Sequence, residues 1–372
     1  MDRFKPAEHW FKQLVFKSCS RVLRKGCDDF KPLNGRHLKK VLFLRPEKIG
    51  DMIISFPVFD GLRKHFPHIK IAILGSPGNA AIIRDDPRFD RVYLYRKNIW
   101  RDLQQLRDIR REGYDCVVDM ICDDSVTALF LSQLAVPGKP RIGVGKVKHR
   151  DFYDFNYEHP IGNTGHIIEN TLKLLLAFGI EPDSISNYAP PYIKQSNMEV
   201  ASKFLTQVCD NDSTETVIGY NLSAGSPTRI WAKEKSVELV KRILDHFPTN
   251  RVILFTIPSE RGRAEWLKAY FSERVDLVPD GMSLVAASAL ISKLDLLITP
   301  DTSLVHIARS FRVPVVGLYS CFMKNFLLWR PFDEEVGAVV SGNDDNIFDI
   351  TVDQVYEAYR AVMSSNCERQ IP

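Results

Sequence analysis

A polar cluster that could bind an anion lies between two apolar runs near residue 300. The run 294–299 ends at Pro300, and a second apolar run follows at 313–318. Asp301 and Thr302 open a helical pattern between them, so the segment predicts a strand, a helix and a parallel strand. Asp301 occupies the expected N-cap position, where its carboxylate would accept a backbone N–H.

The free amides at this helix start could receive a phosphate. The amides of Thr302, Ser303 and Leu304 would point beyond the strand end, with the positive pole of the helix behind them. His306 follows Thr302 by four residues, so both side chains would lie on the face nearest the anion. For this stretch alone, an ordinary capped helix with a histidine lying on the sheet is the commoner explanation.

A carboxylate in the first half could act as a general base. The apolar run 40–44 is followed by segment 45–51, in which Gly50 and Asp51 begin the next predicted helix. Asp51 would then lie at the mouth of a cleft, where it could take the proton of a hydroxyl group. Simple N-capping by Asp51 is the alternative, and one Gly-Asp pair does not decide between them.

Small residues and an arginine follow a strand in the second half. Segment 221–231 contains Gly225 and Ser226, which would let the backbone approach a phosphate, and Arg229, which carries a permanent charge. The chain has neither GxxxxGK[ST] nor GxGxxG, and the nearest glycine-rich piece, 143–146, matches neither spacing. Kinase-like and standard dinucleotide-binding functions are therefore not favoured.

Metal and disulfide patterns are weak. Asp123 and Asp124 are adjacent carboxylates, which are more typical of a helix start than of a metal site, and no metal is expected. The seven cysteines form no CxxC pair. This pattern fits a reducing cytoplasm rather than a disulfide framework or a zinc site.

Strands and helices alternate in both halves of the chain, which predicts an α/β protein with two doubly wound parallel sheets and a cleft between them. The predicted strands are 40–44, 70–74, 91–95, 115–119, 217–220, 252–255, 294–299 and 313–318. The predicted helices are 50–65, 79–84, 100–112, 125–134, 166–178, 198–208, 233–247, 260–271, 283–292, the helix after Asp301, and 352–363. Segment 146–165 is predicted to be a long loop.

Length and proline content predict the domain boundaries. A chain of 372 residues favours two domains over one core. Segment 181–192 carries three prolines and no apolar period, so it is the expected linker. The predicted parts are an extension at 1–38, a first domain at 39–185 and a second domain at 186–372, whose last helix could pack back on the first.

The net charge of +4 is concentrated at the amino end. Residues 1–36 hold nine Lys or Arg against four Asp or Glu, so the other 336 residues carry about −1 and binding of nucleic acid by bulk charge is not indicated. Residues 5–25 predict a basic amphipathic helix that suits an anionic membrane surface, or equally a packing or pairing role. No apolar run of 18 residues and no signal segment is visible, which favours the cytoplasm.

The motifs and their order resemble glycosyltransferase family 9, the bacterial lipopolysaccharide heptosyltransferases. The matching features are R-x-x-x-I-G-D at 45–51, P-x-x-x-x-L-R-K-x-F-P at 57–67, the strand at 114–119, segment 223–231, and P-D-T-S-x-x-H-x-A at 300–308 followed by V-P-V-V-G-L-Y-S. The resemblance runs from about Lys39 to the end of the chain. It implies a GT-B fold with two Rossmann-like domains, the acceptor on the first and the nucleotide sugar on the second.

The resemblance also implies a reaction and a set of roles. Heptose would pass from ADP-heptose to a lipopolysaccharide core acceptor, with inversion and without a metal or other cofactor. Asp51 matches the base, and Arg229 matches a cation on the leaving phosphates, which fixed positive groups must stabilise. The remaining donor-binding matches are Asp301 on heptose hydroxyls, the amides of Thr302 and Ser303 on the diphosphate, His306 in the same motif, Glu260 on ribose and Met282 at adenine.

The acceptor and its surroundings are predicted by position and charge. An anionic core sugar would favour cations near the first cleft, and the candidates are Arg45, Lys48, Arg84, Lys97, Arg141 and Lys148. The lipid-linked acceptor implies a peripheral protein on the cytoplasmic face of the inner membrane of a Gram-negative bacterium, attached through residues 1–36.

Three departures from the family pattern leave the sugar open. Ser303 replaces a frequent glycine, and segments 120–124 and 319–333 lack the family's usual polar and Ser/Thr-Pro-rich residues. The alternatives are another nucleotide sugar, in a transferase or an epimerase, or a non-catalytic two-lobed sugar-binding protein.

Overall fold

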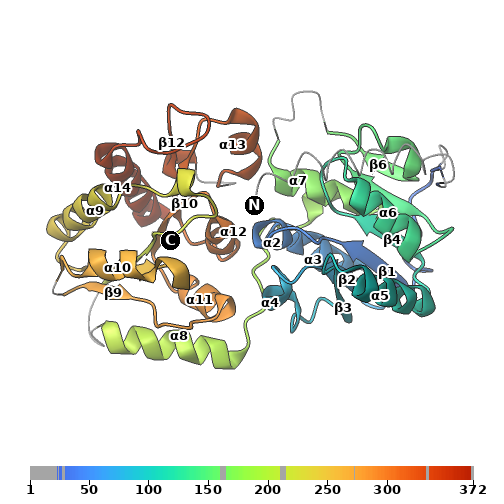
Figure 1. Ribbon diagram of the computed structural model, residues 1–372, viewed down its shortest axis with the longest axis horizontal. Helices are drawn as coiled ribbons and strands as arrows, with labels where there is room; N and C mark the ends of the chain where they lie inside the picture. The colour runs from blue at the N-terminus through green and yellow to red at the C-terminus, as the bar shows by residue number, and fades with distance from the viewer. Residues whose placement is uncertain are drawn as a thin grey trace. The chain divides into compact units, whose positions relative to one another are not determined.

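The computed structural model describes residues 23, 25–26, 30–159, 165–209, 215–271, 273–331 and 335–369 (Figure 1). They belong to two compact units, Met1–Asn187 and Tyr188–Pro372. The basic amphipathic helix predicted over 5–25 falls, except for residues 23 and 25, outside the described residues. Among the helices that are described, none combines the length and the apolarity needed to cross a bilayer.

The first unit is built on a six-stranded parallel sheet. Its strands lie in the order β3-β2-β1-β4-β5-β6. The strands are β1 (Lys40–Leu44), β2 (Lys70–Gly75), β3 (Arg91–Leu94), β4 (Cys116–Asp119), β5 (Arg141–Val144) and β6 (Phe155–Tyr157). The α-helices are α2 (Ile49–Ile53), α3 (Phe56–His65), α4 (Ala80–Ile83), α5 (Ile99–Glu112), α6 (Val126–Ala135) and α7 (Ile167–Leu172).

Alternating side chains of the central strand β1 explain why helices cover both faces of this sheet. Leu42 and Leu44 join one apolar cluster with Leu106 of α5 and Leu131 of α6. Phe43 points to the opposite face, where its ring meets Phe59 of α3 edge-on at 5.0 Å. Burial of both faces is what a near-continuous apolar strand requires.

The second unit repeats this plan with the strand order β12-β11-β10-β7-β8-β9. Its strands are β7 (Thr216–Asn221), β8 (Asn250–Phe255), β9 (Val275–Leu277), β10 (Leu296–Pro300), β11 (Val315–Tyr319) and β12 (Ala338–Val340). Its helices are α8 (Gln195–Val208), α9 (Lys233–His246), α10 (Arg261–Lys268), α11 (Leu284–Ile291), α12 (Ser303–Ser310), α13 (Met323–Trp329) and α14 (Val352–Arg369). The closing helix α14 contributes Val355 and Tyr359 to the same apolar cluster as Ile218 of β7.

Both strand orders are the Rossmann order 3-2-1-4-5-6, which confirms the predicted fold class. In this topology the first strand of a unit lies between its second and fourth, so the chain leaves the two central strands in opposite directions. The crevice at that point is where ligands bind in open α/β sheets. It lies at the carboxyl ends of β1 and β4 in the first unit, and of β7 and β10 in the second.

Some elements were predicted wrongly, and others were not predicted. The loop predicted over 146–165 contains β6, a three-residue edge strand that pairs with β5. The prediction also missed the strands β5, β9 and β12, which have only three or four residues each, and the helix α13. The single helix predicted to residue 65 is two helices, since the chain turns at Ser55 before α3 begins.

Candidate active site

The amino end of α12 is capped by Thr302 and not, as predicted, by Asp301. Thr302 has extended backbone angles, and its Oγ1 accepts the amide of Leu304 at 3.3 Å. Leu304 is therefore not one of the free amides that were expected. Within the described part of the chain, the amides of Thr302 and Ser303 donate to no other protein group. These two N–H groups leave the helix end available to an anion.

Arg229 and Asp301, predicted to contact different parts of a donor, are paired with each other. Nη1 of Arg229 lies 2.8 Å from Oδ2 of Asp301 and 3.3 Å from its carbonyl oxygen. The pair joins the segment after β7 to the end of β10, and both side chains are partly exposed, at 33% and 21%. Among described residues, Nε and Nη2 of Arg229 have no protein partner, so a planar part of the cation remains for a phosphate.

A buried hydrogen-bond network that the sequence did not reveal fixes this corner. Nδ2 of Asn221 donates to the carbonyl of Ser223 at 3.0 Å and to Oγ1 of Thr299 at 2.9 Å. Oγ1 of Thr299 in turn lies 3.1 Å from Oγ1 of Thr302. The end of β7 is thereby tied to the cap of α12, which keeps the helix end rigid.

The two small residues before Arg229 have different roles. Gly225 is exposed, and a Cβ there would meet nothing within 4 Å, so the space beside its backbone is open. Ser226 caps the short helical turn Pro227–Arg229, its Oγ lying 3.0 Å from Oγ1 of Thr228. The turn therefore positions Arg229, while Gly225 leaves room for a ligand.

Glu260 and Met282 follow β8 and β9, on the other side of β7 from α12. In the described chain, Oε2 of Glu260 is buried and accepts no hydrogen bond. A buried carboxylate oxygen without a partner is costly, and a hydroxyl donor from a ligand would relieve that cost. Met282 is half-buried, and its amide donates to the carbonyl of Pro279 at 3.3 Å.

His306 is buried in the second unit and does not project toward the helix end as expected. Its ring meets Trp329 edge-on at 5.7 Å, and its Nδ1 has no hydrogen-bond partner among the described residues. Burial and the neighbouring Arg309 guanidinium lower the pKa of His306 to about 4. The ring is therefore neutral near pH 7 and supplies no positive charge to a phosphate.

In the first unit, Asp51 lies in the first turn of α2, whose N-cap is Lys48 and whose first residue is Ile49. The helix thus begins one residue earlier than predicted. Oδ2 of Asp51 accepts the Lys48 amide at 3.0 Å, whereas Oδ1 lies 3.7 Å from Nη2 of Arg45. One carboxylate oxygen of Asp51 therefore does cap the helix, and the other oxygen lies near the guanidinium of Arg45.

Arg45 was predicted to contact the acceptor, but its side chain is buried and engaged. Nε donates to the carbonyl of Asp51 at 3.0 Å, and Nη1 donates to Oε2 of Glu47 at 2.7 Å and to the carbonyl of Met120. Arg45 therefore positions two carboxylates. Burial and the nearby carboxylates of Asp51 and Asp119 raise the pKa of Glu47 to about 7, although Arg45 opposes this shift.

A buried ion pair at the ends of β4 and β5 was also missed. Nζ of Lys146 lies 2.9 Å from Oδ2 of Asp119, which also accepts the Tyr153 hydroxyl at 2.5 Å. Nζ donates further to the carbonyls of Ile121 and Asp123. Gly145, with φ of 66°, turns the chain inward just before Lys146. The pair fixes the loop after β4 beside Arg45 and Met120.

The other acceptor candidates divide between the surface and the interior. Lys48, Arg84, Lys97 and Lys148 are exposed, as a role toward an anionic ligand requires. The prediction for Arg141 was wrong, because its buried Nε donates to the carbonyl of Phe152 at 2.6 Å.

In the acidic pair after β4, Asp124 has a structural role. Asp124 accepts the amides of residues 147, 148 and 149 at 2.8–3.2 Å, which explains one carboxylate of the Asp123–Asp124 pair without a metal. The described residues contain no group of three or more His, Cys, Asp or Glu side chains that could hold a metal ion.

Replacing Lys146 by Met should destabilise the protein, because Asp119 would keep a buried charge without its partner. We expect the free energy of unfolding to fall by about 3–5 kcal/mol in urea denaturation. Lys148→Met, at an exposed position two residues away, is the matched control and should change it by less than about 0.5 kcal/mol. Equal losses in the two variants would contradict a stabilising ion pair.

His306→Phe should make stability less sensitive to acid. The folded pKa of His306 is about 4 and its ordinary value is 6.5, so between these values the unfolded chain binds the extra proton. The contribution of His306 to the free energy of unfolding is fully present above pH 6.5. It falls with pH, by about 2 kcal/mol between pH 8 and pH 5. The variant should lack this part of the loss, whereas His68→Gln, at an exposed site, should retain it. An unchanged pH dependence in His306→Phe would refute the assignment.

Comparison with known proteins identifies the family of the chain. The family model described as glycosyltransferase family 9 (heptosyltransferase) matches residues 103–351, more than half of the chain. The Haemophilus influenzae lipopolysaccharide core heptosyltransferase OpsX is 22% identical over 85% of this chain and 88% of its own length.

Solved structures show the same fold. A family 9 glycosyl transferase from Veillonella parvula has a TM-score of 0.72 at 19% identity, over 88% of this chain and 97% of that one. The E. coli heptosyltransferase WaaC with ADP has a TM-score of 0.64 at 19% identity, over 89% and 98%. The chain belongs to glycosyltransferase family 9, the heptosyltransferase family, and is a glycosyltransferase of GT-B fold.

Proposed function

We propose that this glycosyltransferase moves heptose from ADP-heptose to a hydroxyl group of a lipopolysaccharide core acceptor, with inversion at the anomeric carbon. The observation that carries the proposal is the corner of the second unit where Arg229 meets two unengaged amides at the start of α12. A diphosphate needs this kind of site: a delocalised cation beside N–H groups at a helix pole. The similar E. coli enzyme was solved with ADP, which supports the choice of nucleotide.

The remaining donor contacts follow from the polar groups around this corner. Asp301 would accept hydrogen bonds from the sugar while it keeps Arg229 in place. The buried Oε2 of Glu260 would accept a ribose hydroxyl, and the backbone at Met282 would lie against adenine. These groups occupy three strand ends of one sheet, so a nucleotide extending along that edge could reach all of them.

Asp51 is the proposed base. Its carboxylate takes the proton of the acceptor hydroxyl as that oxygen attacks the anomeric carbon of heptose. The bond between this carbon and the diphosphate oxygen breaks in the same displacement, and ADP leaves with the electron pair. A single displacement from the side opposite the leaving group inverts the configuration, so no covalent sugar–enzyme intermediate is needed.

Stabilisation of the departing ADP is assigned to protein groups and not to a metal ion. The guanidinium of Arg229 and the amides of Thr302 and Ser303 are fixed before the reaction, so they can stabilise new negative charge without reorganising. The exposed cations Lys48, Arg84, Lys97 and Lys148 are proposed to attract the anionic acceptor.

The proposed location is the cytoplasmic face of the inner membrane of a Gram-negative bacterium. A nucleotide sugar and a lipid-linked acceptor would meet there. The basic residues of segment 1–36, which lies largely outside the described residues, would attract the protein to anionic lipid.

A donor screen tests the function. The full chain is incubated with lipopolysaccharide that lacks heptose and with ADP-heptose, UDP-glucose or GDP-mannose, and the products are identified by mass spectrometry and NMR. We expect transfer from ADP-heptose alone, inversion of the anomeric centre, and an unchanged rate in EDTA. Transfer from UDP- or GDP-sugar only, or conversion of a nucleotide sugar without transfer, would contradict the proposal.

A further inference from the structure

The start of helix α5 exposes two large apolar side chains. Ile99 and Trp100, the first two residues of the helix, are 67% and 79% exposed. Trp100 has the largest exposed fraction among the described tryptophans, and the buried Trp231 offers a contrast at 3%. Burying an aromatic side chain of this size is strongly favourable, so its exposure to solvent indicates an interaction surface.

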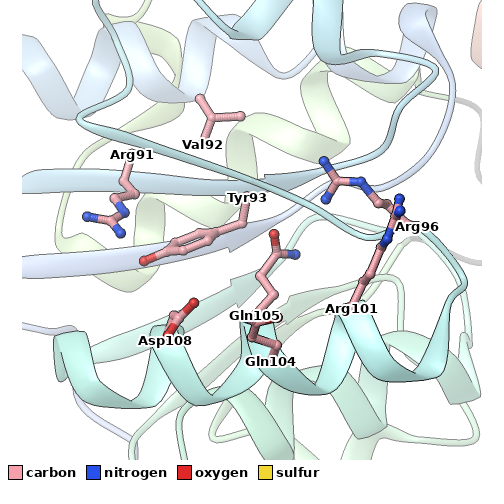
Figure 2. A pocket seen from close by; sticks show the side chains of 8 residues that line it. All are labelled: Arg91, Val92, Tyr93, Arg96, Arg101, Gln104, Gln105 and Asp108. Carbon is pink, nitrogen blue, oxygen red and sulfur yellow. The ribbon is translucent and has the colours of Figure 1, made fainter.

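Basic side chains surround these two residues. Arg96 and Lys97 precede them and Arg101 follows, and all three are exposed. Arg96 and Arg101 also line a cavity of about 400 Å³ between β3 and α5. Figure 2 shows both guanidinium groups together at the end of this cavity away from Arg91. We call residues Arg96, Lys97, Ile99, Trp100 and Arg101 the Trp100 surface.

Hydrogen bonds hold the turn that carries the Trp100 surface in one conformation. The buried carboxylate of Asp102 accepts the amides of Arg96 and Asn98, each at 2.9 Å. The side chain of Asn98 accepts the amide of Arg101 at 3.2 Å, and Lys97 has a left-handed φ of 57°. The carboxylate of Asp102 therefore accepts backbone N–H groups inside the turn, and it forms no ion pair with the described cations outside the turn.

The Trp100 surface lies at a functionally relevant edge of its unit. The turn follows β3, so it lies at the carboxyl edge of the sheet, the same edge as Asp51 after β1. Strands β3 and β1 are separated only by β2. A partner bound here would be close to the proposed site of the acceptor within the same unit.

We propose that the Trp100 surface docks on a bilayer containing anionic phospholipid. Trp100 and Ile99 would enter the interfacial layer, and the three basic side chains would contact lipid phosphates, with Arg96 and Arg101 able to hold one phosphate at the mouth of their cavity. Tryptophan favours the membrane–water interface, and cations beside an apolar projection match an anionic headgroup layer. The nearby Asp108 is paired with Arg111 and does not oppose this charge.

The purpose of this docking rests on the proposed function, because it would bring a lipid-linked acceptor to Asp51. The docking itself does not. Vesicle binding is measured without donor or turnover, so its failure would leave the glycosyl transfer untouched, and a failed transfer assay would leave the docking surface standing.

Tryptophan emission tests contact directly. The full chain and its Trp100→Phe variant are mixed with vesicles of phosphatidylcholine and phosphatidylglycerol that carry brominated acyl chains, and the difference between their spectra isolates Trp100. We expect this component to shift to shorter wavelength and to be quenched on anionic vesicles but not on pure phosphatidylcholine. A Trp100 component that is neither shifted nor quenched overturns the proposal. A shift that instead grows with protein concentration in the absence of vesicles assigns the surface to a second copy of the chain, which also overturns it.

Co-sedimentation with the same vesicles tests the two kinds of side chain. Ile99→Ser/Trp100→Ser should lower partitioning about tenfold, whereas Tyr270→Ser, at an exposed aromatic in the second unit, should not. Arg96→Gln/Arg101→Gln should weaken binding at low salt, unlike Lys64→Gln/Lys70→Gln, which removes the same charge at two other exposed positions of the first unit. Equal effects in the variants and their controls would exclude a specific role for the Trp100 surface.

Discussion

The structure depends on a constraint of parallel sheets: every strand of a unit delivers its carboxyl end to the same edge. In each unit the first and fourth strands are neighbours, and the chain leaves them in opposite directions. Backbone amides and side chains from distant segments therefore converge without a special loop. This convergence brings Arg45 beside Met120 in the first unit and Arg229 beside Asp301 in the second.

The two units use this convergence differently. At the end of β4 in the first unit, the buried charges of Lys146 and Asp119 pair with each other, and Nζ of Lys146 also donates to the carbonyls of Ile121 and Asp123. The result is a rigid support for Arg45 and, through it, for Asp51. The second unit leaves groups unsatisfied: two amides at the start of α12, part of the Arg229 guanidinium and one oxygen of Glu260, all within the described residues. Unsatisfied polar groups on a rigid frame favour a polar ligand, whereas a satisfied network favours the positioning of one reactive group.

The sequence predicted what local patterns determine. Apolar runs revealed the long central strands, and motif order revealed the family, because both are legible along the chain. The cap of α12 was predicted one residue too early, at Asp301 and not at Thr302. The carboxylate of Asp301 pairs with Arg229, which lies 72 residues earlier in the chain. Arg45, Arg141 and Lys146 show the same limit. The sequence does not show whether a cation will be buried, because that depends on acceptors which only the fold brings to it, as in all three of these cases.

In the proposed reaction, the second unit binds the diphosphate and the first unit supplies the base. Calorimetric titration with ADP, combined with turnover measurements on Asp51→Asn and Arg229→Gln, tests this most directly. Arg229→Gln should weaken ADP binding by about tenfold or more, because a charge-assisted contact is lost. Asp51→Asn should bind ADP within about twofold of the unmodified chain and show no measurable transfer. Loss of ADP binding in Asp51→Asn, or unchanged ADP affinity in Arg229→Gln, would contradict the account.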